Sequence, residues 1–332
     1  MAIGPVYRPL LELCREANVD IASALRDSEL TEAEILDPNT RIPTERARAF
    51  GKRLIALVGD PELGLRAAER FRPEDADLVG YLVRHSPNLI EALIALARYV
   101  RLLGDAAEAS VERADGRVTV TIGLAGGRRY LPEAADFIVA VLVRGVREIT
   151  GDAANLVEVR LARPEPRERE PYRRYFRAPI VFDAEQNTVV YGEAALGVPF
   201  RESDPRLRAI LERRAEDVLA TLPAPQSLAE HVRASIGRRL GLGEVGLGTV
   251  ARDLAVSERT LRRRLRESGL SYRVLLDAVR SERALSLVAE RRYTVTMMAQ
   301  LLGFSDATSF ARAFRRWTGS LPHEYTRNSL RH

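Results

Sequence analysis

The side chains best suited to chemistry in this sequence are arginines that recur along one face of a single helical segment. They lie opposite Leu261 and Leu265, and they are Arg259, Arg262, Arg263 and Arg266. A guanidinium group can donate two hydrogen bonds to guanine O6 and N7, and it also neutralises a phosphate group. Such a run could form a solvated helix face in any protein, and a nucleic-acid contact is favoured if the run lies inside a helix-turn-helix with a serine cap. Arg264 is turned by ~100° from its neighbours on a helix and should lean away from the contact.

The elements that position these arginines are predicted to be two short helices in residues 249–265. Val250, Ala251 and Leu254 repeat at the spacing of a buried helix face. Ser257 follows them, and serine is a preferred N-cap for a second helix. Two helices joined by a tight turn form a helix-turn-helix, whose second helix commonly enters the DNA major groove. We add Ser257 and Thr260 to the candidate DNA contacts.

A second helix-turn-helix is predicted in residues 294–325. Gly303 separates two short helices, and Ser305 or Asp306 can cap the second of them. The buried stripe of this second helix is formed by Phe310, Phe314 and Trp317, at spacings of four and three.

The outer face of this second helix carries small groups and arginines. Its candidate DNA contacts are Asp306, Ala307, Thr308, Ala311, Arg312, Arg315 and Arg316. We expect the small groups to contact thymine methyls and Arg312 to reach a purine. Arg315 and Arg316 lie one turn later and are better placed for phosphate.

A single long helix is predicted to connect the two motifs. Residues 271–290 contain no glycine or proline, and their apolar side chains repeat at helical spacing. Twenty helical residues span ~30 Å, close to the ~34 Å between successive major-groove faces on one side of B-DNA. One chain could therefore place two recognition helices in adjacent grooves.

This tandem arrangement resembles the AraC/XylS family of bacterial transcription regulators. The residues that carry the resemblance are Gly303-Phe304-Ser305, Phe310, Phe314-Arg315, Gly319, Pro322 and Tyr325, with Ser257 to Leu265 upstream. Family members usually have a basic residue after the final tyrosine, whereas Thr326 stands there in this chain and Arg327 follows. The resemblance implies double-stranded DNA as a partner and contact with RNA polymerase, and it is compatible with a homodimer.

The first 222 residues mix both kinds of periodicity and predict an α+β domain. Helical patterns occur at 6–17, 45–58, 87–103, 132–150 and 205–221. Strand-like runs occur at 110–114, 117–123, 156–161, 179–183 and 188–191. Asp115-Gly116 lies between two of these runs and predicts a tight hairpin, and Glu185 to Asn187 predicts another turn.

This half is similar to the arabinose-binding-like N-terminal domain of one AraC subgroup. The similarity rests on Phe182 to Val190, on Ala194-Ala195-Leu196 and on Ser203-Asp204-Pro205. It implies a domain that binds a small-molecule effector or dimerises. The subgroup's name does not identify the effector, because its members sense varied molecules.

Charge is divided unevenly along the chain. Residues 227–332 hold 19 arginines and 10 acidic residues, which gives +9, while the remainder holds 32 basic and 36 acidic residues, which gives −4. A basic third on an acidic body is typical of a module that binds a polyanion. Cys14 is the only cysteine, which excludes internal disulfides and fits a reducing cytoplasm. No secretory signal or membrane-spanning run is recognisable, so we expect a cytoplasmic protein.

Three further signals favour ordinary structural interpretations. Gly241 to Gly246 fits the G-x-G-x-x-G pattern, but a predicted helix precedes it, whereas a dinucleotide site needs a strand there. The four histidines have no metal-ligand spacing, so no metal or cofactor is expected. The charge-dense stretch from Arg163 to Arg177 could bind an acidic ligand, but a solvated loop and helix face with mixed ion pairs is favoured.

These observations predict an α+β effector-binding domain at 1–222, a proline-stiffened linker at 223–226 and an all-α DNA-binding domain at 227–332. The predicted function is that of a non-enzymatic, sequence-specific transcription regulator, with activation of a neighbouring operon expected ahead of repression. Two alternatives stay open at this stage. One is a non-specific DNA-binding protein, and the other is a repair enzyme fused to a DNA-binding module, in which Cys14 would accept an alkyl group.

Overall fold

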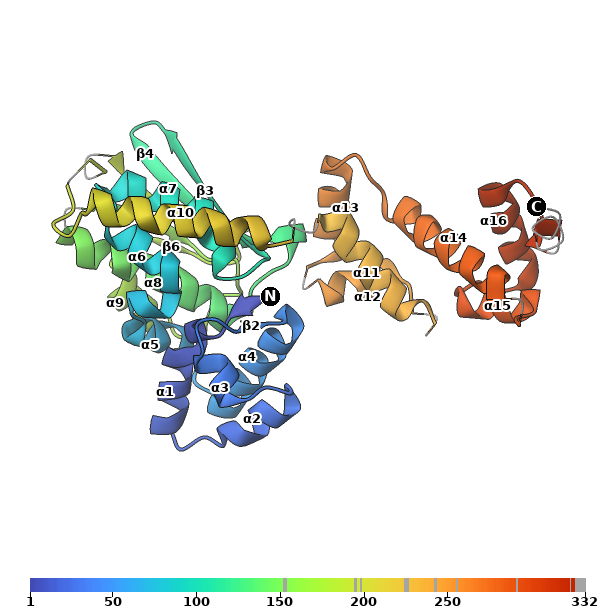
Figure 1. Ribbon diagram of the computed structural model, residues 1–332, viewed down its shortest axis with the longest axis horizontal. Helices are drawn as coiled ribbons and strands as arrows, with labels where there is room; N and C mark the ends of the chain where they lie inside the picture. Colours follow the sequence, from blue (N-terminus) through green and yellow to red (C-terminus); the bar gives the residue numbers. More distant parts are fainter. Residues whose placement is uncertain are drawn as a thin grey trace. The chain divides into compact units, whose positions relative to one another are not determined.

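The chain forms two units in the computed structural model (Figure 1). The first unit comprises Met1–Leu124 and Tyr130–Pro225, and the second comprises Ala125–Arg129 and Gln226–His332. The structure describes residues 1–151, 154–193, 196–197, 199–223, 227–241, 244–254, 256–290, 292–322 and 324–325. The first unit combines helices with a sheet and the second is helical, which confirms the predicted fold class.

The predicted hairpin forms strands β3 (Ala107–Ala114) and β4 (Arg117–Leu124) of the first unit. Asp115 and Gly116 have φ angles of 52° and 70°, and Ala114 pairs with Arg117. Positive φ at both central residues is the two-residue turn that matches the twist of a hairpin. The Asp-Gly pair thus fixes the register of the whole ladder.

Three more strands complete a five-stranded sheet in the order β3-β4-β7-β5-β6. They are β5 (Leu156–Arg160), β6 (Ile180–Val181) and β7 (Asn187–Gly192). Only the β5–β6 pair is parallel. Val118, Val120 and Ile122 of β4 alternate into the core with Val159 and Val189, as a strand with one buried face requires.

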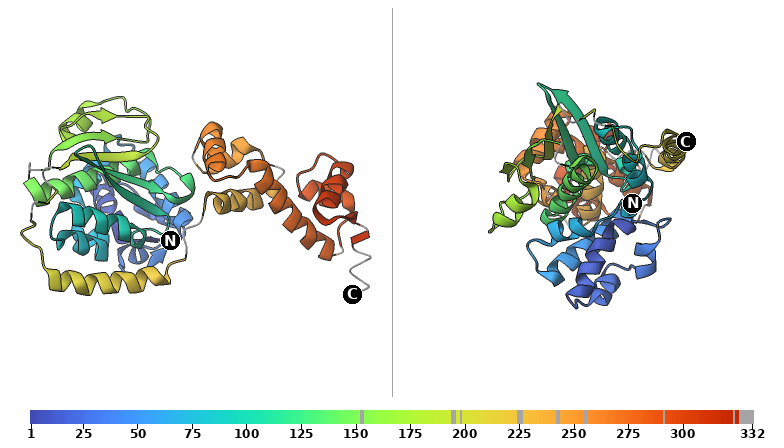
Figure 2. Two further views of the ribbon diagram at one scale, coloured as in Figure 1. Left: turned by 90° about the horizontal axis from the view of Figure 1, so that it is seen from above. Right: turned by 90° about the vertical axis from the view of Figure 1, so that its left-hand side faces the viewer.

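Helix α8 (Pro132–Thr150) packs in this core together with α5 (Leu63–Arg70) and α7 (Leu89–Tyr99). The helices α5 and α8 approach closely because Gly64 has no side chain, and a Cβ there would overlap the Glu133 carbonyl oxygen. The predicted helix at 205–221 is α10 (Pro205–Thr221), which begins at the N-cap Asp204. Figure 2 shows α10 packed along the outside of α6 (Asp77–Arg84).

The N-terminal segment forms a small helical layer with its own core around Leu11, Cys14 and Phe50. Its helices are α1 (Arg8–Glu16), α2 (Ile21–Asp27), α3 (Glu32–Leu36) and α4 (Thr44–Val58). A two-stranded ladder joins β1 (Ala2–Ile3) to β2 (Arg41–Ile42). The helices α2, α3, α5 and α6 were not predicted, because five to eight residues hold too few turns for a clear apolar period.

The prediction that Arg163 lies on a solvated surface was wrong. Its guanidinium forms an ion pair with Asp136, and the two side chains are 11% and 1% exposed. Tyr172, in α9 (Glu170–Phe176), donates a hydrogen bond to the same Asp136 oxygen at 2.7 Å. The rest of the stretch partly matches the expectation, because the Arg169–Glu165 ion pair is exposed.

Some predicted features lie outside the described residues. Of the predicted linker at 223–226, only Pro223 is described, and its carbonyl accepts a hydrogen bond from Arg101. Ala194 and Ala195, which contributed to the family resemblance, are also outside, as are Gly243, His323 and residues 326–332.

Candidate nucleic-acid interface

The first predicted helix-turn-helix is formed by α12 (Leu247–Asp253) and α13 (Glu258–Glu267). The Ser257 hydroxyl accepts a hydrogen bond from the Thr260 amide at 3.1 Å, which confirms the predicted N-cap. Leu261 and Leu265 are buried against Val250, Ala251 and Leu254, as the spacing predicted. Burial of this apolar stripe fixes the opposite face of α13 toward solvent.

The outer face of α13 is strongly cationic. Arg259, Arg262, Arg263 and Arg266 are all exposed, Thr260 is partly exposed and Arg264 is half-buried. Arg262 lies 3.5 Å from Glu258 and Arg263 lies 3.8 Å from Glu267. Exposed pairs of this kind contribute only ~0–1 kcal/mol, so these guanidinium groups can exchange a carboxylate for a phosphate or a base edge at small cost.

The second predicted helix-turn-helix is formed by α15 (Val295–Leu301) and α16 (Ala307–Thr318). Gly303 has a φ of 67°, a left-handed conformation that ends α15 and that glycine adopts without strain. Asp306 is the N-cap of α16 and accepts the Ser309 amide hydrogen bond at 2.7 Å. That bond and those from the Ser309 and Ser305 hydroxyls lower the pKa of Asp306 to about 2.

The two faces of α16 differ sharply. Phe310 and Phe314 are completely buried, whereas Asp306, Thr308, Arg312, Arg315 and Arg316 are exposed and Ala307 and Ala311 are partly exposed. The guanidinium groups of Arg312 and Arg315 have no hydrogen-bond or ion-pair partner in the described part of the chain. Arg316 differs, because its guanidinium contacts the Asp277 carboxylate at 2.9 Å.

The predicted connecting helix is present as α14 (Tyr272–Glu290), which leads from one motif to the other (Figure 1). Its 19 residues span ~28 Å. Tyr272 anchors its first turn by donating a hydrogen bond to the Val245 carbonyl at 2.8 Å, in front of α12. The Arg316–Asp277 pair joins α16 to the same helix. Each motif is therefore tied to α14 through side chains.

Arg280 on α14 positions the second motif, and this role was not predicted from the sequence. It donates hydrogen bonds to the carbonyls of Leu302 at 2.9 Å and Gly303 at 2.6 Å, and it stacks 4.3 Å above the Phe304 ring. It thus satisfies carbonyls at the end of α15 that have no partner within the helix. The available signal was its position four residues after Leu276 and eight after Tyr272, on the inward stripe of the helix.

We expect Arg280→Met to lower the free energy of unfolding of the second motif by about 1–3 kcal/mol, because two carbonyls lose a charged donor. Trp317 lies 6.1 Å from the Phe304 ring and is the only tryptophan, so its fluorescence reports denaturation there. Arg283→Met is the matched control, because Arg283 is exposed on the same helix. Equal denaturation midpoints for the two variants would show that the Arg280 contacts do not stabilise the motif.

A second cluster missed from the sequence braces α11 (Leu228–Leu240) against α12. Asp253 receives two hydrogen bonds from Arg239, at 2.6 and 2.7 Å, and one from Ser235 at 2.6 Å. These donors lower the pKa of the Asp253 carboxyl. The cluster fixes α12, and through the turn it fixes the orientation of α13.

The remaining sequence signals are the glycine-rich pattern, the possible metal ligands, the possible membrane spans and Cys14. The glycine-rich pattern follows α11, and Gly246 precedes α12, so no strand leads into it as a dinucleotide site requires. Within the described ranges, no group of three His, Cys, Asp or Glu residues could hold a metal ion. None of the described helices is long and apolar enough to cross a membrane. Cys14 is fully buried, and burial raises its pKa to about 11.

Comparisons with known proteins match both halves of the chain. Residues 19–200 match the family model described as the arabinose-binding domain of AraC transcription regulator, and residues 250–328 match a helix-turn-helix domain model. The ornithine utilization regulator of Pseudomonas aeruginosa is 32% identical over 321 residues, which cover 95% of this chain and 93% of that protein.

Two more similarities extend along most of the chain. The regulator VirS of Mycobacterium tuberculosis is 25% identical over 268 residues, covering 80% of this chain and 78% of that protein. The crystal structure of the regulator CdpR from Pseudomonas aeruginosa covers 97% of both chains, with 25% identity and a TM-score of 0.44. The family match to more than half of the chain settles the assignment. The chain belongs to the AraC family of transcription regulators, with an N-terminal ligand-binding domain and a DNA-binding helix-turn-helix domain.

Proposed function

We propose that this protein activates transcription of genes beside its own by binding a specific DNA site under the control of a small-molecule effector. The observation that carries the proposal is the pair of capped recognition helices, α13 and α16, joined by α14. Each exposes arginines on the face opposite its buried stripe. Two such helices double the length of DNA that one chain can read.

The two helices divide recognition unequally. Arg259, Arg262, Arg263 and Arg266 on α13 provide bidentate contacts to guanine and strong, salt-dependent attraction to phosphates. Ser257 and Thr260 approach the backbone at the start of that helix. On α16, Ala307, Thr308 and Ala311 fit thymine methyl groups, and Arg312 provides the long donor.

Substitutions of Arg312 and Arg315 are expected to affect DNA binding differently. Arg312→Ala should weaken a specific site more than random DNA, because Arg312 reaches a base edge. Arg315→Ala should weaken both DNAs alike and reduce the slope of log affinity against log salt by ~1, because it neutralises one phosphate. Titrations of both DNAs at several salt concentrations separate these outcomes. An equal loss on both DNAs for Arg312→Ala would reassign it to the backbone.

The test of the proposal as a whole is footprinting and transcription on the DNA beside the gene. We expect protection of two adjacent major-groove faces about one helical turn apart, and stimulation of transcription by RNA polymerase. A protein that protects its own promoter no better than random DNA would be a non-specific binder instead. Protection with reduced transcription would make it a repressor. A homodimer would appear as two such protected units.

The repair-enzyme alternative is disfavoured by the state of Cys14. A cysteine that accepts an alkyl group reacts as an accessible thiolate. Cys14 is fully buried in the core around Phe50, and its raised pKa keeps the thiol protonated. The two relatives described above are named as regulators.

A further inference from the structure

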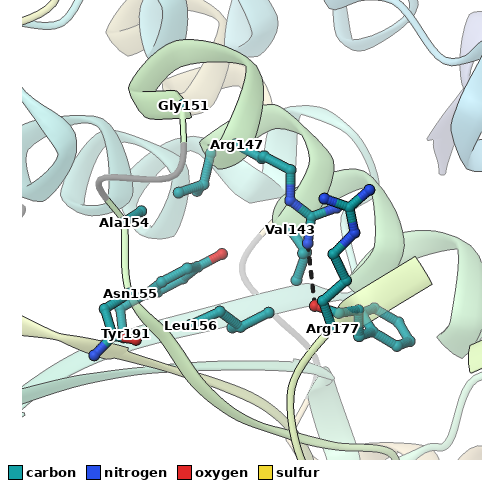
Figure 3. A pocket seen from close by; sticks show the side chains of 10 residues that line it. Val143, Arg147, Gly151, Ala154, Asn155, Leu156, Arg177 and Tyr191 are labelled. Atoms are coloured by element: carbon teal, nitrogen blue, oxygen red, sulfur yellow. Dashed lines mark hydrogen bonds between the residues drawn. The ribbon is translucent and has the colours of Figure 1, made fainter. Parts of the chain in front are cut away.

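A cavity of about 170 Å³ lies in the first unit, among the C-terminal part of α8, the strands β5 and β7, and the end of α9 (Figure 3). Its apolar wall is formed by Val143, Val146, Leu156 and Phe176, three of which are almost completely buried. Arg177 and Asn155 also line it and are exposed, so the cavity reaches the surface on their side. An apolar wall with a few convergent polar groups is typical of a small-molecule site.

Two guanidinium groups, those of Arg147 and Arg177, line this cavity. Arg147 donates hydrogen bonds to the carbonyls of Tyr175 and Phe176, each at 3.1 Å, which uses two of its five N–H donors and fixes its position. Arg177 makes no side-chain hydrogen bond or ion pair with any described residue. None of the described residues that line the cavity carries a carboxylate. Within the described part of the wall, no carboxylate neutralises this positive charge.

The backbone of Arg177 has an unusual conformation. Its φ is 54°, in the left-handed region, where it ends α9 by donating its amide hydrogen bond to the Arg173 carbonyl. Glycine or asparagine is favoured at this position of a helix end, because other side chains are strained there. An arginine at this position is therefore less favourable for the backbone than glycine or asparagine would be.

The Tyr191 hydroxyl is the third feature. The side chain is 1% exposed, and the hydroxyl oxygen has no hydrogen-bond partner among the described residues. Figure 3 shows it pointing from β7 toward the part of the cavity where Arg147 lies. Burial raises the pKa of Tyr191 and the charge of Arg147 opposes the rise, so the hydroxyl remains a donor. A buried hydroxyl without a partner is costly unless another molecule supplies the acceptor.

We propose that this cavity is the effector site and that it binds a small organic carboxylate whose body is apolar. The carboxylate would accept hydrogen bonds from Tyr191, Arg147 and Arg177, while its hydrocarbon part would lie against Val146, Leu156 and Phe176. This inference rests on the proposed function for the statement that an effector exists, and it adds the location and chemical class of that effector.

The cavity volume restricts the size of the ligand. A closed cavity of ~150 Å³ is known to hold benzene, so a space of about 170 Å³ suits a molecule of six to nine heavy atoms. The apolar wall favours an organic acid over inorganic phosphate, which could not use that wall. Ornithine carries a carboxylate, but its two ammonium groups would face Arg147 and Arg177 unfavourably.

The first experiment is calorimetric titration of the full chain with 3-methylbutanoate and benzoate. The uncharged amides of the same shape, inorganic phosphate and ornithine serve as comparison probes. We expect at least one carboxylate to bind one site, at least ~10-fold more tightly than its amide. Absence of binding by both carboxylates, equal binding of acid and amide, or tighter binding of phosphate or ornithine would each overturn the proposal.

Two substitutions remove the polar groups while sparing the fold. Tyr191→Phe deletes only an unpartnered oxygen, and Arg177→Gly relieves the left-handed strain, so neither should lower the melting temperature of the free protein. Each should weaken carboxylate binding by at least ~10-fold. Glu29→Gly relieves the same kind of strain at a φ of 52° outside the cavity and should bind like the wild type. Wild-type affinity in both cavity variants would place the ligand elsewhere.

Footprinting without ligand separates this inference from the proposed function. Both cavity variants should protect the promoter as the wild type does, and should lose the response to the carboxylate. Specific protection by a wild type that binds no carboxylate would refute the cavity site alone. Absence of specific protection by the wild type would refute the proposed function, whatever binds in the cavity.

Discussion

Replacing Arg262 or Arg263 with alanine is expected to weaken binding to the specific DNA site by about 5- to 150-fold each, equivalent to ~1–3 kcal/mol. Both side chains are exposed on α13, and Leu261 and Leu265 hold the opposite face in the core. Their ion pairs with Glu258 and Glu267 are long and exposed, so little energy holds them away from DNA. The preference at one base pair should relax in each variant.

Arg53→Ala is the matched control for this prediction, because it removes one exposed positive charge from α4 of the first unit. Its affinity for the specific site should stay within about twofold of the wild type, since an exposed charge outside the recognition helices adds only screened attraction. Affinity is measured against the specific site and against DNA with single base changes. Wild-type binding by both α13 variants would place recognition on another face of that helix.

The recognition helices could be predicted because their signals are local. Ser257 and Asp306 cap helices whose buried residues follow within one or two turns, and Gly303 adopts the backbone that only glycine adopts freely. Burial of Phe310 and Phe314 then determines which arginines of α16 face outward. Capping, periodicity and turn chemistry act over fewer than ten residues, so one sequence is enough to recognise them.

The partners of the bracing arginines could not be predicted, because they are brought together only by the tertiary fold. Arg280 contacts carbonyls 22 and 23 residues away, and Arg239 contacts a carboxylate 14 residues away. The spacing of Arg280 from Leu276 and Tyr272 places it on the inward stripe of its helix, but that spacing does not identify its acceptors. A buried arginine must find acceptors, but the sequence does not say which ones.

The proposed effector cavity was beyond sequence reasoning for a similar reason. Its wall combines α8, β5, α9 and β7, and its residues lie between 143 and 191 with no recurring spacing. Tyr191 is distinctive only because its hydroxyl lacks a partner, which is a property of the packed structure. Arg177 belonged to a charge-dense stretch that predicted a solvated surface, and its side chain is indeed exposed. Its positive φ was not evident from the sequence.

Asp136→Ala is expected to lower the free energy of unfolding of the first unit by about 3–5 kcal/mol, because it leaves the charged, buried guanidinium of Arg163 without its hydrogen-bond acceptor. Arginine cannot lose its proton to escape this cost. The transition of the first unit is followed by calorimetry, while Trp317 fluorescence reports the second unit and should not change. Glu165→Ala breaks the exposed Arg169–Glu165 pair in the same region and should leave the transition where it is.

Loss of Asp136 can destabilise the fold even if the ionised Asp136–Arg163 pair contributes no net stability. The pH dependence of stability distinguishes these two contributions. Burial raises the pKa of Asp136 from 3.8 to about 6, and this effect outweighs the opposing ones of Arg163 and Tyr172. The folded state therefore holds this proton more tightly than the unfolded state does. The stability that Asp136 contributes is fully present below about pH 4 and declines as pH rises through about 6.

The stability difference between the wild type and Asp136→Ala should therefore shrink between pH 4.5 and 7.5. The double variant Asp136→Leu with Arg163→Met removes both charges and should recover most of the lost stability. If the double variant is as unstable as Asp136→Ala, the ion pair contributes directly to the stability of the fold. The conclusion that the cost of burying Asp136 outweighs its attraction to Arg163 would then be wrong.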